Sequence, residues 1–200
     1  MKIVCPLNDE QFQQIRDERR EQIKKAALKV FSRRGLVGTK ISMIAKEAGV
    51  SQGLTYRYFQ SKDELFIELV QEAMEESAAA FTDLENVEVS PTEIIKTLTA
   101  KMLDESNRHS FMIIQQGQTS DEVPERAKEI AQQFSTTSFI EKVIPIFKKG
   151  QEMGEFCQGD PFALLMFYFS VISGLMLQQT GEAEQDQVSK INILMKMLRN

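Results

Sequence analysis

The 200-residue sequence has no tryptophan, a single histidine and two cysteines. Because His109 is the only histidine, we expect neither a histidine-centred metal site nor a Ser/His catalytic triad. Cys5 and Cys157 lie far apart and lack the spacing of a metal site or a disulfide framework, which is typical of a reducing cytoplasm. The nucleotide-binding patterns GxxxxGKS/T and GxGxxG are also missing. The sequence therefore predicts no metal, no cofactor and no enzyme.

Long hydrophobic runs are absent as well. The longest apolar segment, Phe162 to Leu177, is shorter than the roughly 20 residues that a membrane-spanning helix needs, and Ser170, Ser173 and Gly174 interrupt it. The N-terminus lacks the basic and apolar regions of a signal peptide. We therefore expect a cytoplasmic protein without a membrane partner, in which this apolar segment forms a buried helix.

Charge is distributed unevenly along a chain of ordinary globular composition, with 42% hydrophobic and 26% charged residues. Residues 1–65 contain 13 Lys and Arg against 8 Asp and Glu, a net charge of +5. The remainder contains 11 against 21, a net charge of −10. The basic N-terminal part favours a nucleic-acid contact at one end of the molecule, although a solvated surface can show the same difference.

Apolar residues recur at helical spacing along nearly the whole chain without sustained alternation, so we expect an all-α protein. The first helix should begin at about Asp17 and end at Gly35, since glycine suits the position after a helix. A short second helix, capped by Thr39, should end at Gly49. Ser51 can cap a third short helix that reaches the residue before Gln60.

A fourth, long helix should begin at a capping box formed by Ser61 and Glu64. A fifth should begin at Ser90-Pro91, with a cap followed by an N1 proline, and reach about Asn107. The segment Gln115 to Glu122 is interpreted as a turn around a glycine.

A longer helical pattern runs from Val123 to Met153, and Pro145 inside it should kink or split the helix. Asp160-Pro161 can cap and begin the apolar helix. A final amphipathic helix is expected over Gln185 to Arg199.

The segment Lys40 to Phe59 predicts a helix, a glycine turn and a second helix, the arrangement of a helix-turn-helix whose second helix enters the major groove. An ordinary helical hairpin with a polar face has the same spacing. Two aromatic hydroxyls and an arginine on so short a helix favour DNA binding. The groups able to reach bases and phosphates belong to Gln52, Thr55, Tyr56, Arg57 and Tyr58.

Two segments, Ile44 to Gly53 and Tyr56 to Phe66, resemble the N-terminal domain of TetR-type bacterial transcriptional regulators. Upstream, Ala26-Ala27-Leu28, Phe31 and Gly35 fit the same pattern. The resemblance is specific over about residues 23–66. A weaker similarity to the segment before and within the family's penultimate helix covers Gly154-Glu155-Phe156 and Asp160 to Leu175.

The resemblance implies a homodimeric, all-helical repressor that binds a palindromic operator on double-stranded DNA and releases it when a small molecule binds the C-terminal part. It implies a helix-turn-helix domain over residues 1–62, and an effector-binding and dimerisation domain over 63–200 that dimerises through its last two helices. Bases would be contacted by Gln52 and Gly53. Phosphates would be contacted by Tyr56, Arg57, Tyr58 and Lys62, while Ala45 and Phe59 would lie in the core. The full set of expected DNA-binding residues is Thr39, Lys40, Ser51, Gln52, Gly53, Thr55, Tyr56, Arg57, Tyr58 and Lys62.

The region from Pro91 to Phe169 is rich in Phe and Met, and its middle portions do not resemble the family, which favours a pocket for an apolar or amphipathic effector. A solid core without a cavity gives the same composition. A helical carrier of apolar ligands is a further alternative, but it would leave the N-terminal segment without a use. The candidate ligand-binding residues are Met102, His109, Phe111, Met112, Gln115, Phe134, Phe147 and Phe167.

Overall fold

The computed structural model describes residues 9–82, 89–133, 135–178 and 184–199 of the chain. Within these ranges it has ten helices and no strand, which confirms the expected all-α fold. The helices are α1 (Asp9–Arg34), α2 (Ile41–Glu47), α3 (Gln52–Tyr58), α4 (Lys62–Thr82), α5 (Pro91–Met102), α6 (Glu105–Thr119), α7 (Glu125–Ala131), α8 (Thr136–Glu152), α9 (Pro161–Leu177) and α10 (Glu184–Lys196).

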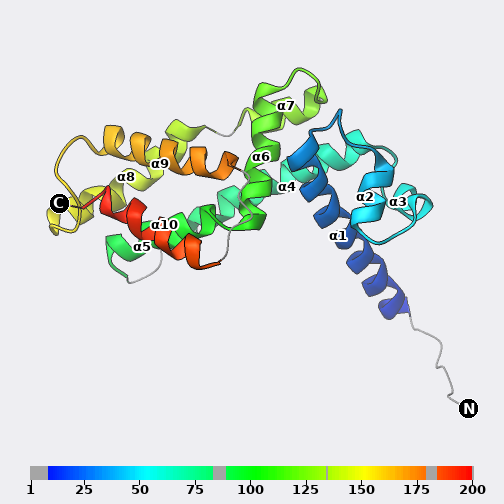
Figure 1. The fold of residues 1–200 in the computed structure, drawn as a ribbon, viewed down its shortest axis with the longest axis horizontal. Helices are drawn as coiled ribbons and strands as arrows, with labels where there is room; N and C mark the ends of the chain where they lie inside the picture. The colour runs from blue at the N-terminus through cyan, green and yellow to red at the C-terminus, as the bar shows by residue number, and fades with distance from the viewer. Residues whose placement is uncertain (1–8, 83–88, 134, 179–183, 200) are drawn as a thin grey trace, which may run out of the picture.

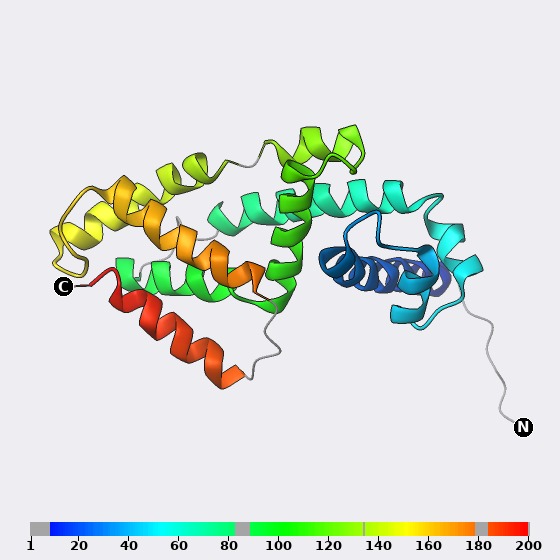
Figure 2. The ribbon, with the colours of Figure 1, turned by 45° about the horizontal axis from the view of Figure 1, so that its top comes forward.

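The helices form two parts that share two connecting helices (Figure 1). We call α1, α2 and α3 the head, and α5 with α8, α9 and α10 the body. Figure 2 shows α4 extending from the head to the body, with α6 crossing it. Helix α6 also packs against α1, so the head contacts two helices that reach the body.

One hydrophobic core runs from the head into the connecting helices. It joins Ile23 and Phe31 of α1 to Phe66 of α4, and continues to Ile113 of α6 and Ala127 of α7. The rings of Phe31 and Phe66 meet edge to face, with centroids 5.3 Å apart. A second core unites α5, α8, α9 and α10. Helix α4 begins at Lys62 and contributes to the head's core from its first turns. The domain boundary expected after residue 62 therefore stays a prediction.

The buried hydroxyl group of Tyr168 connects three helices of the second core. The Tyr168 hydroxyl lies 2.7 Å from the Thr99 hydroxyl and donates to the Met195 sulfur at 3.5 Å. Burial raises the pKa of Tyr168 to about 12, although the Thr99 hydrogen bond lowers it, so the phenol is neutral at physiological pH. These contacts hold α9 against α5 and α10.

Local sequence signals for helix ends are confirmed. The side chains of Ser51, Ser90 and Asp160 accept hydrogen bonds from the backbone N–H groups of Leu54, Glu93 and Phe162. The expected glycine ends are also present, because Gly35 and Gly49 have φ of 68° and 65°.

The caps of α2 and α4 differ from the prediction. Thr39 does not cap α2, because its hydroxyl donates to the Gly35 carbonyl at 2.7 Å, and Lys40 stands at the cap without a side-chain bond. Ser61 does accept from the N–H of Glu64. The Glu64 carboxylate, however, accepts from Gln60 rather than from Ser61, so only half of the capping box forms as expected.

Helix α1 begins at Asp9, eight residues earlier than predicted. This first part has no buried side chain, so apolar periodicity could not reveal it. Hydrogen bonds between side chains one turn apart stabilise this part of the helix. Gln13 donates to Asp17 and Gln14 donates to Glu18, both at 3.0 Å.

The predicted boundaries between residues 91 and 153 are partly wrong. The helix from Pro91 ends at Met102, because Asp104 caps a new helix by accepting from Ser106. The long pattern divides at residues 132–135, where Ser135 caps α8, and Pro145 lies inside a continuous α8. A serine cap therefore marks this division, and the proline does not.

The turn expected around Gly117 is also wrong, since this glycine lies inside α6. A Cβ there would be 2.6 Å from the Cβ of Ala131 and 3.4 Å from the Ala127 carbonyl oxygen. The glycine therefore allows α6 and α7 to approach closely, and it does not end the helix.

The apolar helix α9 is buried on one face only. Its residues Leu165, Tyr168 and Ile172 are fully buried, whereas Phe167 is 66% exposed and Leu177 is 52% exposed. The expectation of a buried helix therefore holds for one face of α9 and not for the other. None of the helices in the described ranges is long and apolar enough to cross a membrane.

We predict that Gly117→Ala lowers the free energy of unfolding by about 1–3 kcal/mol, because the new methyl group overpacks the contact between α6 and α7. The matched control is Gly53→Ala on α3, where no atom lies within 4 Å, and there the change should stabilise by about 0.5–1 kcal/mol. Chemical denaturation of both variants measures the difference. Equal stability of the two variants would contradict the close approach.

Candidate nucleic-acid interface and cavity

The turn between α2 and α3 is held by backbone geometry and by α1. Gly49 takes the left-handed conformation, and the N–H of Val50 donates to the Ala45 carbonyl at 2.9 Å. From α1, the amide of Gln22 donates to the Ala48 carbonyl at 2.6 Å. The orientation of α3 is therefore fixed relative to both α1 and α2.

Helix α3 presents one face to solvent and one to the core. Gln52, Gly53 and Arg57 are exposed, and Tyr56 is 50% exposed. Tyr58 is half-buried against the head's core. The outer face thus offers an amide, a phenol and a guanidinium, the groups that contact base edges and phosphates.

Thr55 does not belong to this outer face, contrary to the prediction. It is fully buried, and its hydroxyl donates to the Ser51 carbonyl at 3.3 Å. Thr39 is likewise buried and bonded to the Gly35 carbonyl. Both threonines have structural positions and are almost fully buried, so neither belongs to the exposed face of α3. Ala45 and Phe59 are buried as expected.

A surface groove lies between α2, α3 and the start of α4. It brings together five of the predicted DNA-binding residues: Thr39, Lys40, Gln52, Tyr56 and Lys62. Ser51, Gly53 and Arg57 lie outside this groove, on or beside α3.

Lys62 has a role that spacing alone did not indicate. Its ammonium donates to the carbonyl of Leu36 at 2.9 Å and to that of Thr39 at 3.3 Å. In the structure the Lys62 ammonium therefore bonds backbone carbonyls of the protein, whereas the prediction assigned it to a DNA phosphate. Lys62 ties the start of α4 to the loop between α1 and α2.

Several basic residues of the head are paired with carboxylates within the protein. Arg20 contacts Glu68 at 2.5 Å, and Lys29 contacts Glu47 at 2.6 Å. The Arg20 guanidinium also lies 4.9 Å from the ring centroid of Phe59. The positive charge counted in the N-terminal sequence is thus partly neutralised by the protein's own carboxylates.

The most buried of these ions is Lys24, whose ammonium lies 2.5 Å from Glu21 and 2.6 Å from Glu72. Burial alone would lower the pKa of Lys24, but the hydrogen bonds to both carboxylates outweigh it and raise the pKa. Burial raises the pKa of Glu72, and the charges of Glu68 and Glu21 raise it further, against the lowering effect of Lys24. This group joins α1 to α4 and is not available to DNA.

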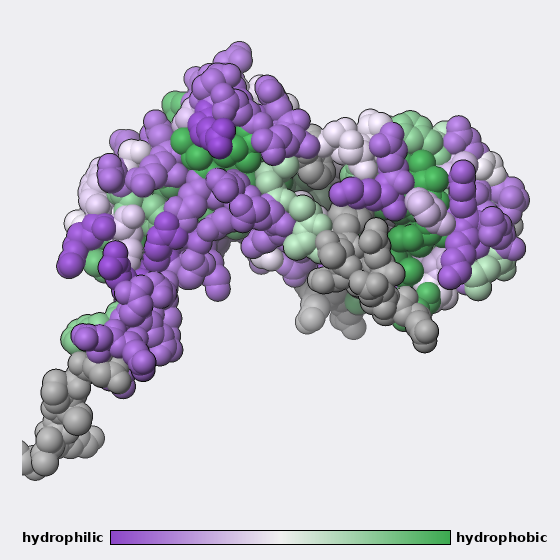
Figure 3. All heavy atoms as spheres, turned by 180° about the vertical axis from the view of Figure 1, so that it is seen from behind, coloured by the Kyte–Doolittle hydropathy of each residue, from purple (hydrophilic) through white to green (hydrophobic). Residues whose placement is uncertain are grey.

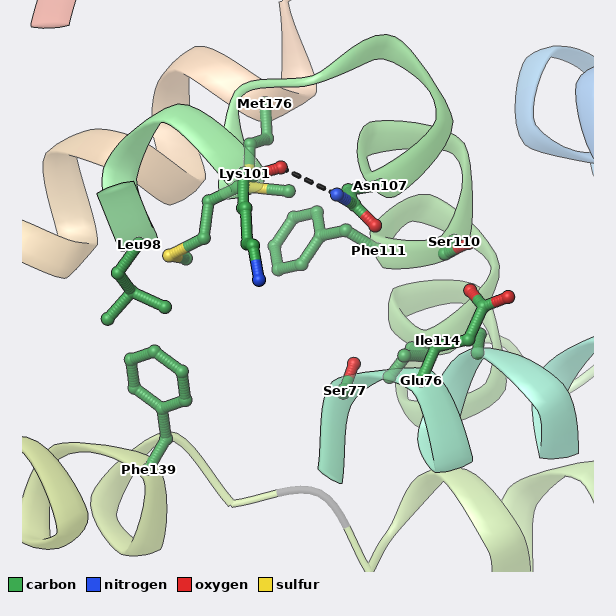
Figure 4. Close-up of a pocket in the computed structure, with 12 residues that line it drawn as sticks. Glu76, Ser77, Leu98, Lys101, Asn107, Ser110, Phe111, Ile114, Phe139 and Met176 are labelled. Carbon is green, nitrogen blue, oxygen red and sulfur yellow. Dashed lines mark hydrogen bonds between the residues drawn. The ribbon is translucent and has the colours of Figure 1, made fainter. Parts of the chain in front are cut away.

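A cavity of about 110 Å³ lies between α4, α5, α6, α8 and α9 (Figure 4). Its walls are mainly apolar. The lining residues are Ala73, Glu76, Ser77, Leu98, Lys101, Met102, Asn107, Ser110, Phe111, Ile114, Phe139 and Met176.

Two of the predicted ligand-binding residues, Met102 and Phe111, line this cavity. Two others are misplaced by the prediction. Phe147 is fully buried and stacks on Phe156 with ring centroids 4.8 Å apart, and Phe167 points to solvent. Composition could not separate cavity, core and surface positions, because the difference depends on which helix faces the side chain.

The remaining predicted ligand-binding residues lie elsewhere. His109, Met112 and Gln115 are half-buried on α6 and do not line the cavity, and Phe134 lies outside the described residues. Burial lowers the pKa of His109, and the charge of Arg33 on α1 lowers it further, against an opposing effect of Glu105.

Most of the residues that line the cavity were not predicted from the sequence. The missed residues lie one turn apart on facing helices, as Leu98 does from Met102 and Ser110 from Ile114. That spacing was the available signal, but it is shared by ordinary core positions.

The head has the geometry of a helix-turn-helix DNA-binding domain. Residues 23–69 match the family model described as "Bacterial regulatory proteins, tetR family". The chain is therefore similar to DNA-binding transcriptional regulators of this family over the head and the start of α4, which supports the resemblance found in the sequence.

Relatives and solved structures agree with this assignment. The uncharacterized HTH-type transcriptional regulator YfiR of Bacillus subtilis is 25% identical over 157 residues, 77% of this chain and 76% of the relative. The HTH-type transcriptional repressor NicS of Pseudomonas putida is 33% identical over 46% of this chain and 44% of its own. A structure described as a Clostridium perfringens putative fatty acid metabolism regulator is 25% identical, with a TM-score of 0.58 over 88% of this chain and 96% of its own.

We predict that Lys62→Met lowers the free energy of unfolding by about 1.5–3 kcal/mol, because two carbonyl groups lose a charged hydrogen-bond donor. Lys40→Met is the matched control, since Lys40 lines the same groove, is exposed and makes no side-chain cap. Its effect should be within about 0.5 kcal/mol. If thermal unfolding finds both variants equally stable, Lys62 does not hold the loop.

Proposed function

We propose that the protein is a cytoplasmic, homodimeric repressor that binds a palindromic operator through α3 and releases it when an apolar or amphipathic small molecule occupies the cavity. The observation that carries this proposal is the sharing of α4 and α6 between head and cavity. Two similar proteins support such a role, since one is a transcriptional repressor and the other a putative fatty acid metabolism regulator.

Helix α6 contacts both the cavity and α1 within a few residues. Phe111 and Ile114 line the cavity, and the amide of Gln116, half a turn further, donates to the Phe31 carbonyl at 3.0 Å. That carbonyl also accepts the N–H of Gly35, where α1 ends. A ligand that changes the position of α6 would thereby change the position of α1.

Helix α4 supplies the second connection. Ala73 and Ser77 line the cavity, and Phe66, two turns before Ala73, lies in the head's core. A ligand acts on DNA binding only if its affinity differs between two arrangements of the heads. In a dimer, the arrangement that places the two α3 helices about 34–36 Å apart fits successive major grooves.

On this proposal, Gln52 and Gly53 contact bases, and the phosphates are contacted by Tyr56, Arg57 and Lys40. The exposed outer face of α3 supports these assignments. The buried Thr39 and Thr55 are left out, and Tyr58 and Lys62 act mainly in the head's own structure.

We predict that Gln52→Ala reduces the discrimination between operator and random DNA by about 1–3 kcal/mol, because a bidentate amide contact to a base is lost. Lys40→Ala should weaken binding to both DNAs alike and lower the salt dependence by about one unit. Binding titrations at several salt concentrations, with an operator selected from random duplexes, measure both effects. A uniform loss for Gln52→Ala would contradict its assignment to a base.

The proposed dimer interface lies on α9 and α10. Exposed apolar side chains lie on these helices, and Gly174 on α9 has no atom within 4 Å of an added Cβ. Figure 3, which views the molecule from behind, shows green, apolar areas between hydrophilic ones on the surface at the body's end of the molecule. Contiguous exposed apolar patches of more than a few hundred Å² mark protein–protein interaction sites. The exposed apolar residues are Phe162, Phe167, Leu177, Val188, Ile193 and Met197.

We predict that sedimentation finds a dimer at micromolar concentration, and that Phe167→Asp raises its dissociation constant about 30-fold or more, as loss of a central apolar contact does. Phe12→Asp is the control, because Phe12 is 59% exposed but lies on α1, far along the chain from the proposed interface. A monomer that binds operator as tightly as the unaltered protein would overturn the dimer.

A further inference from the structure

A second hollow shares one aromatic side chain, Phe139, with the cavity. This hollow of about 130 Å³ opens between α4 and α8, and Phe139 and Ser77 line both spaces. The Phe139 ring packs edge to face on Phe169, with centroids 4.8 Å apart. One half-exposed ring in the first turn of α8 therefore belongs to the walls of both spaces.

The first space favours a flexible apolar occupant. Met102 and Met176 supply unbranched, flexible side chains around it, and Leu98 supplies a branched apolar one. A rigid ring system fills one space and stops at Phe139. A flexible chain can continue past this ring toward Met74 and Ala78 in the second space.

The charged groups of the cavity favour one orientation of an anionic head group. Lys101 directs its ammonium from α5 into the space between Leu98 and Phe111 (Figure 4). In the part of the chain that the structure describes, no ion pair involves Lys101. Glu76 lies on the opposite wall, on α4, and would repel an anion there.

Resting on the effector role proposed above, we propose that the cavity binds an unbranched acyl chain with an anionic head at Lys101, and that Phe139 sets how far the chain extends. The anionic head is either the carboxylate of a free fatty acid or the phosphate groups of an acyl thioester of coenzyme A. Both have the same apolar chain, and both pair with an ammonium group.

Calorimetric titration of the full chain with saturated acids of 8, 10, 12, 14 and 16 carbons tests the chain's path. Affinity should rise about fourfold for each buried methylene and level off where the chain reaches Phe139. In Phe139→Ala the plateau should move to longer chains, and in Phe139→Trp to shorter ones. Since the sequence has no tryptophan, the emission of Trp in that variant reports directly whether the chain reaches the ring.

A comparison of dodecanoate, dodecanoyl-coenzyme A and neutral dodecanol tests the head group. The unaltered protein should prefer at least one of the two anions to the alcohol by about fivefold, and Lys101→Met should lose that preference. Lys142→Met is the matched control in the second hollow, and it should keep the preference. The stronger of the two anions identifies the source of the head group.

Each part of the proposal has an outcome that overturns it. Absence of binding at every chain length, with normal operator binding, removes the acyl ligand and leaves the DNA-binding role intact. Equal affinity for acid, thioester and alcohol removes the anionic head. A plateau that stays at the same length in both Phe139 variants removes the partition. Acyl binding as expected without any effect on operator affinity would instead overturn the proposed effector role.

Discussion

The edge-to-face contact between Phe31 and Phe66 lies at the centre of the structure, because it belongs to a core that head, α4 and α6 build together. A head with its own separate core could move independently of the body. Here the same apolar cluster that orders α1 also fixes the two helices that line the cavity. Close packing of this kind transmits small displacements, since side chains in a dense core cannot shift without moving their neighbours.

The charge of the head is used in two different ways. Lys24 and Arg20 pair with α4 carboxylates and fasten α1 to α4, whereas Arg57 and Lys40 remain on the surface that carries α3. The net positive charge of the N-terminal sequence therefore overstates what DNA meets. Its internal share is structural, and it strengthens the same connection between head and α4 that the aromatic core provides.

The sequence predicted those features that depend on neighbouring residues. Gly49 and Ser51 define the helix-turn-helix within a few positions, so this motif could be predicted from local sequence. The failures concern distant contacts. Gly117 meets Ala131 on another helix, Lys62 bonds the Leu36 carbonyl, and Phe167 faces outward, none of which local spacing encodes. The cavity lies partly in the region from which it was predicted, and Met102 and Phe111 are the predicted ligand-binding residues that line it.

A reciprocal titration tests most directly whether ligand binding in the cavity changes the affinity of α3 for operator DNA. Operator affinity is measured with and without saturating dodecanoate, and dodecanoate affinity is measured with and without saturating operator. The account predicts that each ligand weakens the other by the same factor, about 5- to 150-fold. If dodecanoate binds the protein with the same affinity in the presence and absence of operator, the cavity and the DNA-reading helix are not coupled.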